Sequence, residues 1–222
     1  MNKIAVHLTI VVFAISSVTS LIRRQQQTRT EIETNLSELE RQLPELQSFS
    51  QIDQLRRKNK DKVIALIDLY NPSIPDDTKD KIASTISDLS MKYDNLDVDL
   101  ICATITHESA FSWDPKVESH AGAMGLMQIM PSTGAFLAKF ENIPWTTPEK
   151  VLFDPVINIR LGCRYLSSLI ELYEIDGGLA AYNGGGRIVL KWLANNKADG
   201  ILYKETQNYV PSVLSLYNQY KN

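Results

Sequence analysis

One acidic residue has a sequence position that suits acid–base chemistry. Glu108 ends the stretch VDLICATITHE. Within it, Val98, Ile101 and Ile105 recur at the spacing of one helix face, which predicts a buried helix over residues 97–109. The negative end of the helix dipole and the apolar neighbours both disfavour a carboxylate, so we expect a raised pKa for Glu108. A carboxylic acid that keeps its proton near neutral pH can act as a general acid.

A glycine-spaced, methionine-rich segment follows this acid. Gly122 and Gly125 lead into Met127, Gln128 and Met130. Glycine lets the backbone turn tightly or approach a ligand closely. A glutamine amide donates and accepts hydrogen bonds, which suits sugar hydroxyl and acetamido groups, and methionine offers an apolar wall. Packing in the core is the alternative interpretation of the methionines.

A second polar pair, Tyr182 and Asn183, stands directly before the glycines 184–186. It offers a hydroxyl and an amide beside an open backbone, although the glycines can also simply stop a helix. A phosphate-binding loop is excluded, because the segment lacks a preceding strand and a Lys-Ser/Thr pair. A nucleophilic Ser109 is disfavoured, because no Gly-x-Ser-x-Gly elbow surrounds it.

The elements that must position these residues are predicted to be helices. Strand signals are scarce, so we expect a mainly α fold. Helix starts are indicated by Asp76-Asp77, Pro131-Ser132-Thr133 and Asp154-Pro155, and Gly177-Gly178 is expected to end the third of these helices. Two further helices are expected over Ile188–Leu193 and Tyr209–Tyr217.

The N-terminal region begins with an apolar run. Residues 4–22 contain no Asp, Glu, Lys or Arg, which is enough length to span a bilayer core. Val18-Thr19-Ser20 equally suits a cleaved signal peptide, and either interpretation predicts export. We expect residues 1–24 to be a transmembrane anchor or signal segment.

A helical stalk is expected over residues 25–72, followed by a globular domain over residues 73–222. In the stalk, apolar residues step by four and three like a heptad repeat: Ile32, Leu36, Leu39, Leu43 and Leu46. Pro44 interrupts the repeat and predicts a bend. Such a helix packs on the domain, lies near a membrane or self-associates.

Charge and cysteine content restrict the partners. The net charge is −3, and the residues after position 60 carry 14 Lys/Arg against 20 Asp/Glu, which argues against a nucleic-acid partner. Cys102 and Cys163 form a disulfide or are two separate buried thiols, and the second interpretation is favoured. The three histidines lack ligand spacing, so no metal and no cofactor are expected.

Five blocks follow one another from residue 108 to residue 210: ESAF, SHAGAMGLMQIMPST, DPVINIRLGCRYL, AAYNGGG and ETQNYV. In this order they resemble the lytic transglycosylase domain of the soluble-transglycosylase and goose-type branch of the lysozyme-like superfamily. The resemblance implies a lysozyme-like α-helical fold in a bacterial cell-envelope enzyme, periplasmic or extracytoplasmic and anchored in the inner membrane. The implied substrate is peptidoglycan, cleaved at the β-1,4 bond between N-acetylmuramic acid and N-acetylglucosamine.

The resemblance also implies roles for individual residues. Glu108 is the implied catalytic acid, and Tyr182 is expected to hydrogen bond to it. Glu205 is a supporting residue. The residues that are implied to line the glycan groove are Ser119, Met127, Gln128, Met130, Tyr182 and Asn183.

A single carboxylate is sufficient for the implied reaction. Most glycosidases pair two carboxylates. In the family resembled here, one Glu first protonates the glycosidic oxygen, and the muramic acid acetamido group assists at the anomeric carbon. The same Glu then takes the proton of the C6 hydroxyl, which attacks C1 and leaves a 1,6-anhydro end.

One departure from the family pattern keeps alternatives open. Ser119 lies eleven residues after Glu108 instead of nine, as if Ser112-Trp113 were inserted. The insertion brings Asp114 and Glu118 near the site, where a water-activating role for either would make the protein a lysozyme-type hydrolase. A solvated loop is the favoured interpretation of both residues. Trp113 is expected to stack on a sugar or to plug the loop. A non-catalytic peptidoglycan-binding module is the third interpretation.

Overall fold

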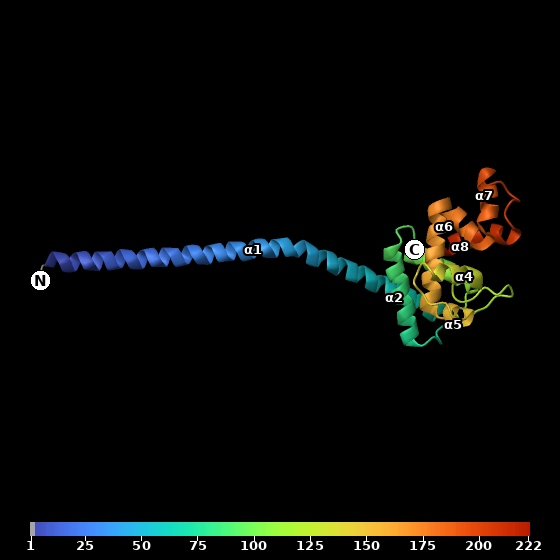
Figure 1. Ribbon diagram of the computed structural model, residues 1–222, viewed down its shortest axis with the longest axis horizontal. Coiled ribbons are helices and arrows are strands. Elements are labelled where there is room, and N and C mark those ends of the chain that lie inside the picture. Colours follow the sequence, from blue (N-terminus) through green and yellow to red (C-terminus); the bar gives the residue numbers. More distant parts are fainter. Residues whose placement is uncertain (1–2) are drawn as a thin grey trace. The chain divides into compact units, whose positions relative to one another are not determined.

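The computed structural model describes the backbone of residues 3–222 and the side chains of residues 13, 15–44 and 46–222. Its helices, in chain order (Figure 1), are α1 (Lys3–Tyr70), α2 (Asp76–Lys92), α3 (Val98–Glu108), α4 (Pro131–Ala138), α5 (Pro148–Leu152), α6 (Pro155–Gly184), α7 (Gly186–Ala194) and α8 (Lys204–Lys221). Two isolated β-bridges join Glu118 to Met124 and Met124 to Ile129, and no strand occurs among the described residues. The predicted mainly α fold is confirmed.

The chain divides into two compact units, one up to Gln54 and one from Leu55 to Asn222. The first consists of α1 alone, and the helix continues through Pro44 without interruption. In the second unit, the last turns of α1 bury Val63 and Ile67 completely. The boundaries at residues 24 and 72 stay a prediction.

The predicted membrane segment lies partly outside the described residues, because the side chains of residues 4–12 and 14 are not described. Among the residues that are described, no helix combines the length and the apolar character needed to cross a bilayer.

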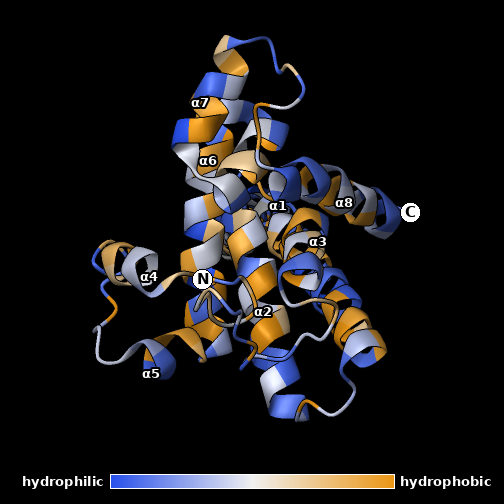
Figure 2. Cartoon of the chain, turned by 90° about the vertical axis from the view of Figure 1, so that its right-hand side faces the viewer, coloured by the Kyte–Doolittle hydropathy of each residue, from blue (hydrophilic) through white to orange (hydrophobic). Residues whose placement is uncertain are grey.

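The core of the second unit forms around α3. Every α3 residue from Leu100 to Thr106 is buried, and buried hydrophobic residues of α2, α3 and α6 belong to one core cluster. The hydrophobic positions of these helices are drawn in orange in Figure 2. The helix begins where the sequence predicts, because the Asp97 carboxylate accepts a hydrogen bond from the backbone N–H of Leu100 at 2.8 Å. Cys102 and Cys163 are both buried and free, as favoured from the sequence.

One prediction about helix ends is confirmed and one is wrong. Helix α2 begins at Asp76, as the sequence indicates, although its N-cap is Pro75 and neither aspartate caps it with a side-chain hydrogen bond. Gly177 and Gly178 do not end α6, which continues to Gly184. The glycines serve close packing instead, since a Cβ on Gly178 would lie 2.6 Å from the Ile170 side chain. The helical backbone of α6 is kinked at Glu174, whose φ of 64° is not helical.

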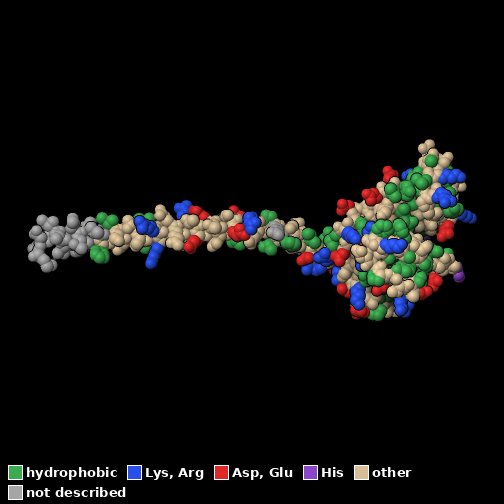
Figure 3. Space-filling model, in the orientation of Figure 1, with side chains coloured by type: hydrophobic (Ala, Val, Ile, Leu, Met, Phe, Trp, Pro, Cys, Tyr) green, Lys and Arg blue, Asp and Glu red, His purple; other side chains and the backbone are tan. Residues whose placement is uncertain are grey.

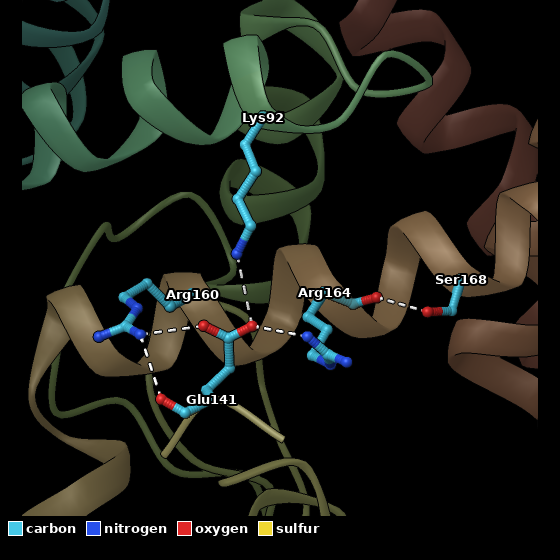
Figure 4. A network of polar contacts seen from close by, with 5 residues as sticks. All are labelled: Lys92, Glu141, Arg160, Arg164 and Ser168. Carbon is cyan, nitrogen blue, oxygen red and sulfur yellow. Dashed lines mark hydrogen bonds and ion pairs between the residues drawn. The ribbon is translucent and has the colours of Figure 1, made fainter. Parts of the chain in front are cut away.

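A buried carboxylate fixes the loop after α4 to the rest of the domain (Figure 4). The Glu141 side chain is only 5% exposed and contacts Arg160 at 2.9 Å, Arg164 at 2.8 Å and Lys92 at 3.5 Å. Burial raises the pKa of Glu141, but the hydrogen bonds from Arg164 and Arg160 outweigh it, so the pKa lies below its ordinary value. The ionised group therefore connects this loop to α2 and α6, and Ser168 donates to the Arg164 carbonyl beside it.

Candidate active site

Glu108 is the last residue of α3, as predicted, and is partly exposed at the domain surface. The Tyr209 hydroxyl, from α8, donates a hydrogen bond to Oε1 of Glu108 at 2.6 Å. Burial raises the pKa of Glu108 to about 7, with a smaller upward contribution from the charge of Glu205 and a downward one from the Tyr209 hydrogen bond. The carboxyl group therefore keeps its proton to a higher pH than an ordinary glutamate does, in agreement with the expected raised pKa.

Tyr209 is the residue that orients Glu108. The sequence analysis expects Tyr182 to hydrogen bond to Glu108, and this expectation is wrong. The Tyr182 hydroxyl donates instead to the Met127 backbone carbonyl at 2.7 Å. Tyr209 is 2% exposed and stands one helical turn after Glu205 on α8. The sequence analysis places Tyr209 in a predicted helix and in the ETQNYV block but assigns no role to Tyr209.

The end of α3 is supported from behind by aromatic side chains. Thr106 accepts hydrogen bonds from Trp113 Nε1 and from the Tyr220 hydroxyl, both at 2.9 Å. The hydroxyls of Tyr220 and Tyr70 are 3.0 Å apart. Trp113 is fully buried, so it plugs the loop and does not stack on a sugar. The inserted residues therefore add to the packing beneath the acid.

The segment over residues 117–130 folds back on itself through hydrogen bonds of its own. The Ser119 hydroxyl accepts from the Ala123 N–H at 3.0 Å. Gln128 has a φ of 46°, and its Nε2 donates to the carbonyls of Gly125 at 2.9 Å and Val117 at 3.2 Å. Gln128 therefore holds the segment together and keeps its amide oxygen as an acceptor.

Four of the six predicted groove residues line one cavity of about 270 Å³, together with Ile129, Thr133 and Tyr165. The four are Gln128, Met130, Tyr182 and Asn183. Ser119 does not line this cavity, and Met127 is fully buried beneath it. A Cβ on Gly162 would lie 2.3 Å from the Met127 sulfur, so glycine is required where the two meet.

Asn158 fixes the 117–130 segment to α6, a role that the sequence analysis did not assign. Its Oδ1 accepts from the Met127 N–H at 2.8 Å, and its Nδ2 donates to the carbonyls of Met124 at 2.8 Å and Leu152 at 2.9 Å. The side chain is fully buried. Gly125 passes directly over it, because a Cβ there would lie 2.3 Å from Nδ2. The available signal was a short polar residue between two isoleucines, Ile157 and Ile159, in a predicted helix.

Glu205 is exposed in the first turn of α8, and its charge acts on Glu108 as described above. Asp114 and Glu118 are both exposed on the loop. Among the residues whose side chains the structure describes, no three His, Cys, Asp or Glu residues gather in a way that could hold a metal ion.

We expect Tyr209→Phe to move the alkaline limb of the pH–activity profile to higher pH. The hydroxyl stabilises the ionised carboxylate, so its loss raises the pKa of Glu108 and keeps the acid form to higher pH. We also expect kcat/KM at the optimum to fall about 10-fold to 100-fold, because the acid loses its orientation. A pH series of kcat/KM measures both effects. Tyr217→Phe is the matched control on α8, and an unchanged alkaline limb in Tyr209→Phe would contradict the role.

Comparison with known proteins places this site in a family context. The model of the family described as "Transglycosylase SLT domain" matches residues 87–210, which contain every predicted site residue. The "Soluble lytic murein transglycosylase" of Escherichia coli (strain K12) is 38% identical over 128 residues, covering 53% of this chain and 19% of that protein. The "Membrane-bound lytic murein transglycosylase C" of Cronobacter sakazakii is 32% identical over 173 residues, covering 68% of this chain and 46% of that protein.

Solved structures agree with these sequence relatives. Lytic transglycosylase Slt from Pseudomonas aeruginosa, in an inactive mutant, has a TM-score of 0.56 and 28% identity, and the match covers 69% of this chain and 25% of that one. A complex of the 70-kDa soluble lytic transglycosylase with bulgecin A has a TM-score of 0.54 and 29% identity, with 77% and 30% covered. The chain thus spans less than half the length of each of these relatives, and the lysozyme-like helical fold implied by the sequence blocks is confirmed.

Proposed function

Because the chain belongs to the transglycosylase SLT family, we propose that it is a peptidoglycan lytic transglycosylase. It cleaves the β-1,4 bond between N-acetylmuramic acid and N-acetylglucosamine and leaves 1,6-anhydro-N-acetylmuramic acid ends. The observation that carries the proposal is Glu108, an acid with a pKa of about 7 at the surface of the domain. The similar soluble and membrane-bound lytic murein transglycosylases support the substrate class.

In this mechanism Glu108 acts twice. As the acid it protonates the glycosidic oxygen, while the substrate acetamido group stabilises the anomeric carbon. As the resulting carboxylate, held by the Tyr209 hydroxyl, it takes the proton of the C6 hydroxyl that attacks C1. A pKa near the working pH favours both proton transfers, because neither protonation state is costly to reach.

The cavity beside Tyr182 is the proposed glycan groove. Met130, 42% exposed, supplies an apolar surface, and Gln128 supplies an acceptor. The Thr206 hydroxyl donates to Oδ1 of Asn183 at 2.7 Å, which leaves the Asn183 amide nitrogen to donate to a sugar. Ser119 and Met127 take part by shaping the segment, and Glu205 supports Glu108 through its charge.

The released muropeptides test this function. Purified sacculi are digested with the protein and the products are analysed by mass spectrometry. Ends lighter by one water than reducing muramic acid are the expected result. Reducing ends would instead show a hydrolase, and no release would show a binding module.

The proposed location is the bacterial cell envelope, outside the cytoplasm. Residues 4–22 anchor the chain in the inner membrane or direct its export as a cleaved signal, and the stalk over residues 25–72 carries the domain. The apolar residues exposed along that stalk support self-association.

A further inference from the structure

The stalk part of α1 carries an apolar stripe that faces solvent. Ile32, Leu36, Leu39, Leu43 and Leu46 are between 55% and 64% exposed, and Figure 3 shows hydrophobic side chains, in green, on the surface of this helix. All five belong to the unit that consists of α1 alone. A single helix in water gains little stability of its own, so a stripe of this kind favours a partner helix.

The spacing of the stripe fits one kind of partner, a second helix in a coiled coil. In the heptad abcdefg, Leu36 and Leu43 take position a, and Ile32, Leu39 and Leu46 take position d. These two positions face the partner in a two-stranded coiled coil. Further back in the same register, Val18 takes position d and Ile22 takes position a, and both are exposed, while the polar Gln25 takes the d position between Ile22 and Arg29.

Two residues that look unfavourable fit this register. Pro44 takes position b, on the outside, so its ring does not enter the seam. Arg29 takes position a, and its Nε contacts Oε1 of Glu33 on the same helix at 2.9 Å. A single polar residue at position a fixes register and restricts the number of strands, at a cost in stability.

The charges beside the seam distinguish the two possible orientations. Position e holds Glu33 and Glu40, and position g holds the neutral Asn35 and Gln42. In a parallel pair, e faces g of the partner, so each glutamate meets an amide. In an antiparallel pair, e faces e, so the glutamates of the two helices repel one another.

We propose that two copies of this chain pair in parallel and in register through residues 29–46, as a two-stranded coiled coil. This orientation also brings the apolar runs over residues 4–22 to the same end, as two chains in one membrane require. The pairing does not depend on the catalytic activity, since no residue of the stripe belongs to the domain that carries Glu108.

Cross-linking of the full chain in detergent micelles tests the pairing. Ile32→Cys places a thiol at position d, and mild oxidation followed by a non-reducing gel should show most of the protein as a covalent dimer. Thr34→Cys, at the outward position f, is the matched control and should cross-link at least tenfold less. Cys102 and Cys163 are buried in the domain and do not compete.

A second pair of variants tests whether cross-linking depends on the apolar residues at positions a and d or only on the two helices being near each other. In the Ile32→Cys background, Leu36→Gln with Leu43→Gln should lower the dimer fraction at least tenfold, whereas Thr34→Gln with Ser37→Gln should change it less than twofold. Equal cross-linking at positions 32 and 34, or none at either, would overturn the proposal. A dimer formed only between Ile32→Cys and Leu43→Cys chains, a d and an a position that meet in an antiparallel pair, would overturn the parallel orientation. No substrate is used, so the result is independent of peptidoglycan cleavage.

Discussion

Glu108→Gln should lower the release of muropeptides from sacculi by at least about 1,000-fold, because the amide cannot donate or accept the transferred proton. The fold should be retained, since Gln has nearly the same shape and is uncharged, as the protonated acid is. The amide oxygen of Gln can still accept from Tyr209, so the midpoint of thermal unfolding should be unchanged or slightly higher. Product analysis by mass spectrometry measures the release, and a thermal melt measures the midpoint. A sacculus co-sedimentation assay should show that binding to peptidoglycan is largely retained.

Glu118→Gln is the control for this substitution. Glu118 is an exposed carboxylate on the loop near the site, so its loss should change activity less than about twofold. A hydrolase that depends on Glu118 as the base would lose activity in this variant as well. Near-normal release by Glu108→Gln would defeat the assignment of the acid.

Asn158→Ala should destabilise the domain by about 3–5 kcal/mol. The substitution leaves one N–H and two carbonyl groups without their buried partner, and each such group costs roughly 1–3 kcal/mol. Activity should fall about 10-fold or more even where the variant is folded, because the 117–130 segment that carries Gln128 and Met130 loses its attachment to α6. Denaturant unfolding and kcat/KM at a permissive temperature measure the two effects.

The matched control is Asn195→Ala. Asn195 is exposed at the end of α7, and its side chain makes one hydrogen bond, from Nδ2 to the Lys191 carbonyl. Its loss should cost less than about 0.5 kcal/mol and leave activity unchanged. Equal effects of the two substitutions would show that Asn158 has no special role in positioning the segment.

The acid and its helix were predictable because their signals are local. Asp97 and Asp154 cap helices through bonds to residues three positions later, and the apolar spacing before Glu108 reports burial directly. The partners of the site were not predictable in the same way. Tyr209 contacts a residue 101 positions away, and Asn158 contacts residues 31 and 34 positions away. Sequence periodicity carries no information about which distant side chain contacts a given residue.

The glycines of α6 show a second limit of local signals. Gly177-Gly178 has the composition of a helix stop, yet both residues are buried inside the helical segment that runs from the kink at Glu174 to Gly184. Their small size is required by the neighbouring turn at Ile170, a packing requirement that a glycine pair alone does not reveal. Gly185, with a φ of 86°, is the residue that does end the helix.

The long separation between Glu108 and its hydrogen-bond donor has a consequence for the timing of synthesis. A ribosome adds roughly 5–20 residues per second, so the 101 positions between Glu108 and Tyr209 correspond to roughly 5–20 s. During that interval a nascent chain already contains the acid but not the tyrosine that holds it or the helix that covers α3. We therefore expect the hydrogen-bonded form of the Glu108 site to be completed late in synthesis, when α8 docks on α3.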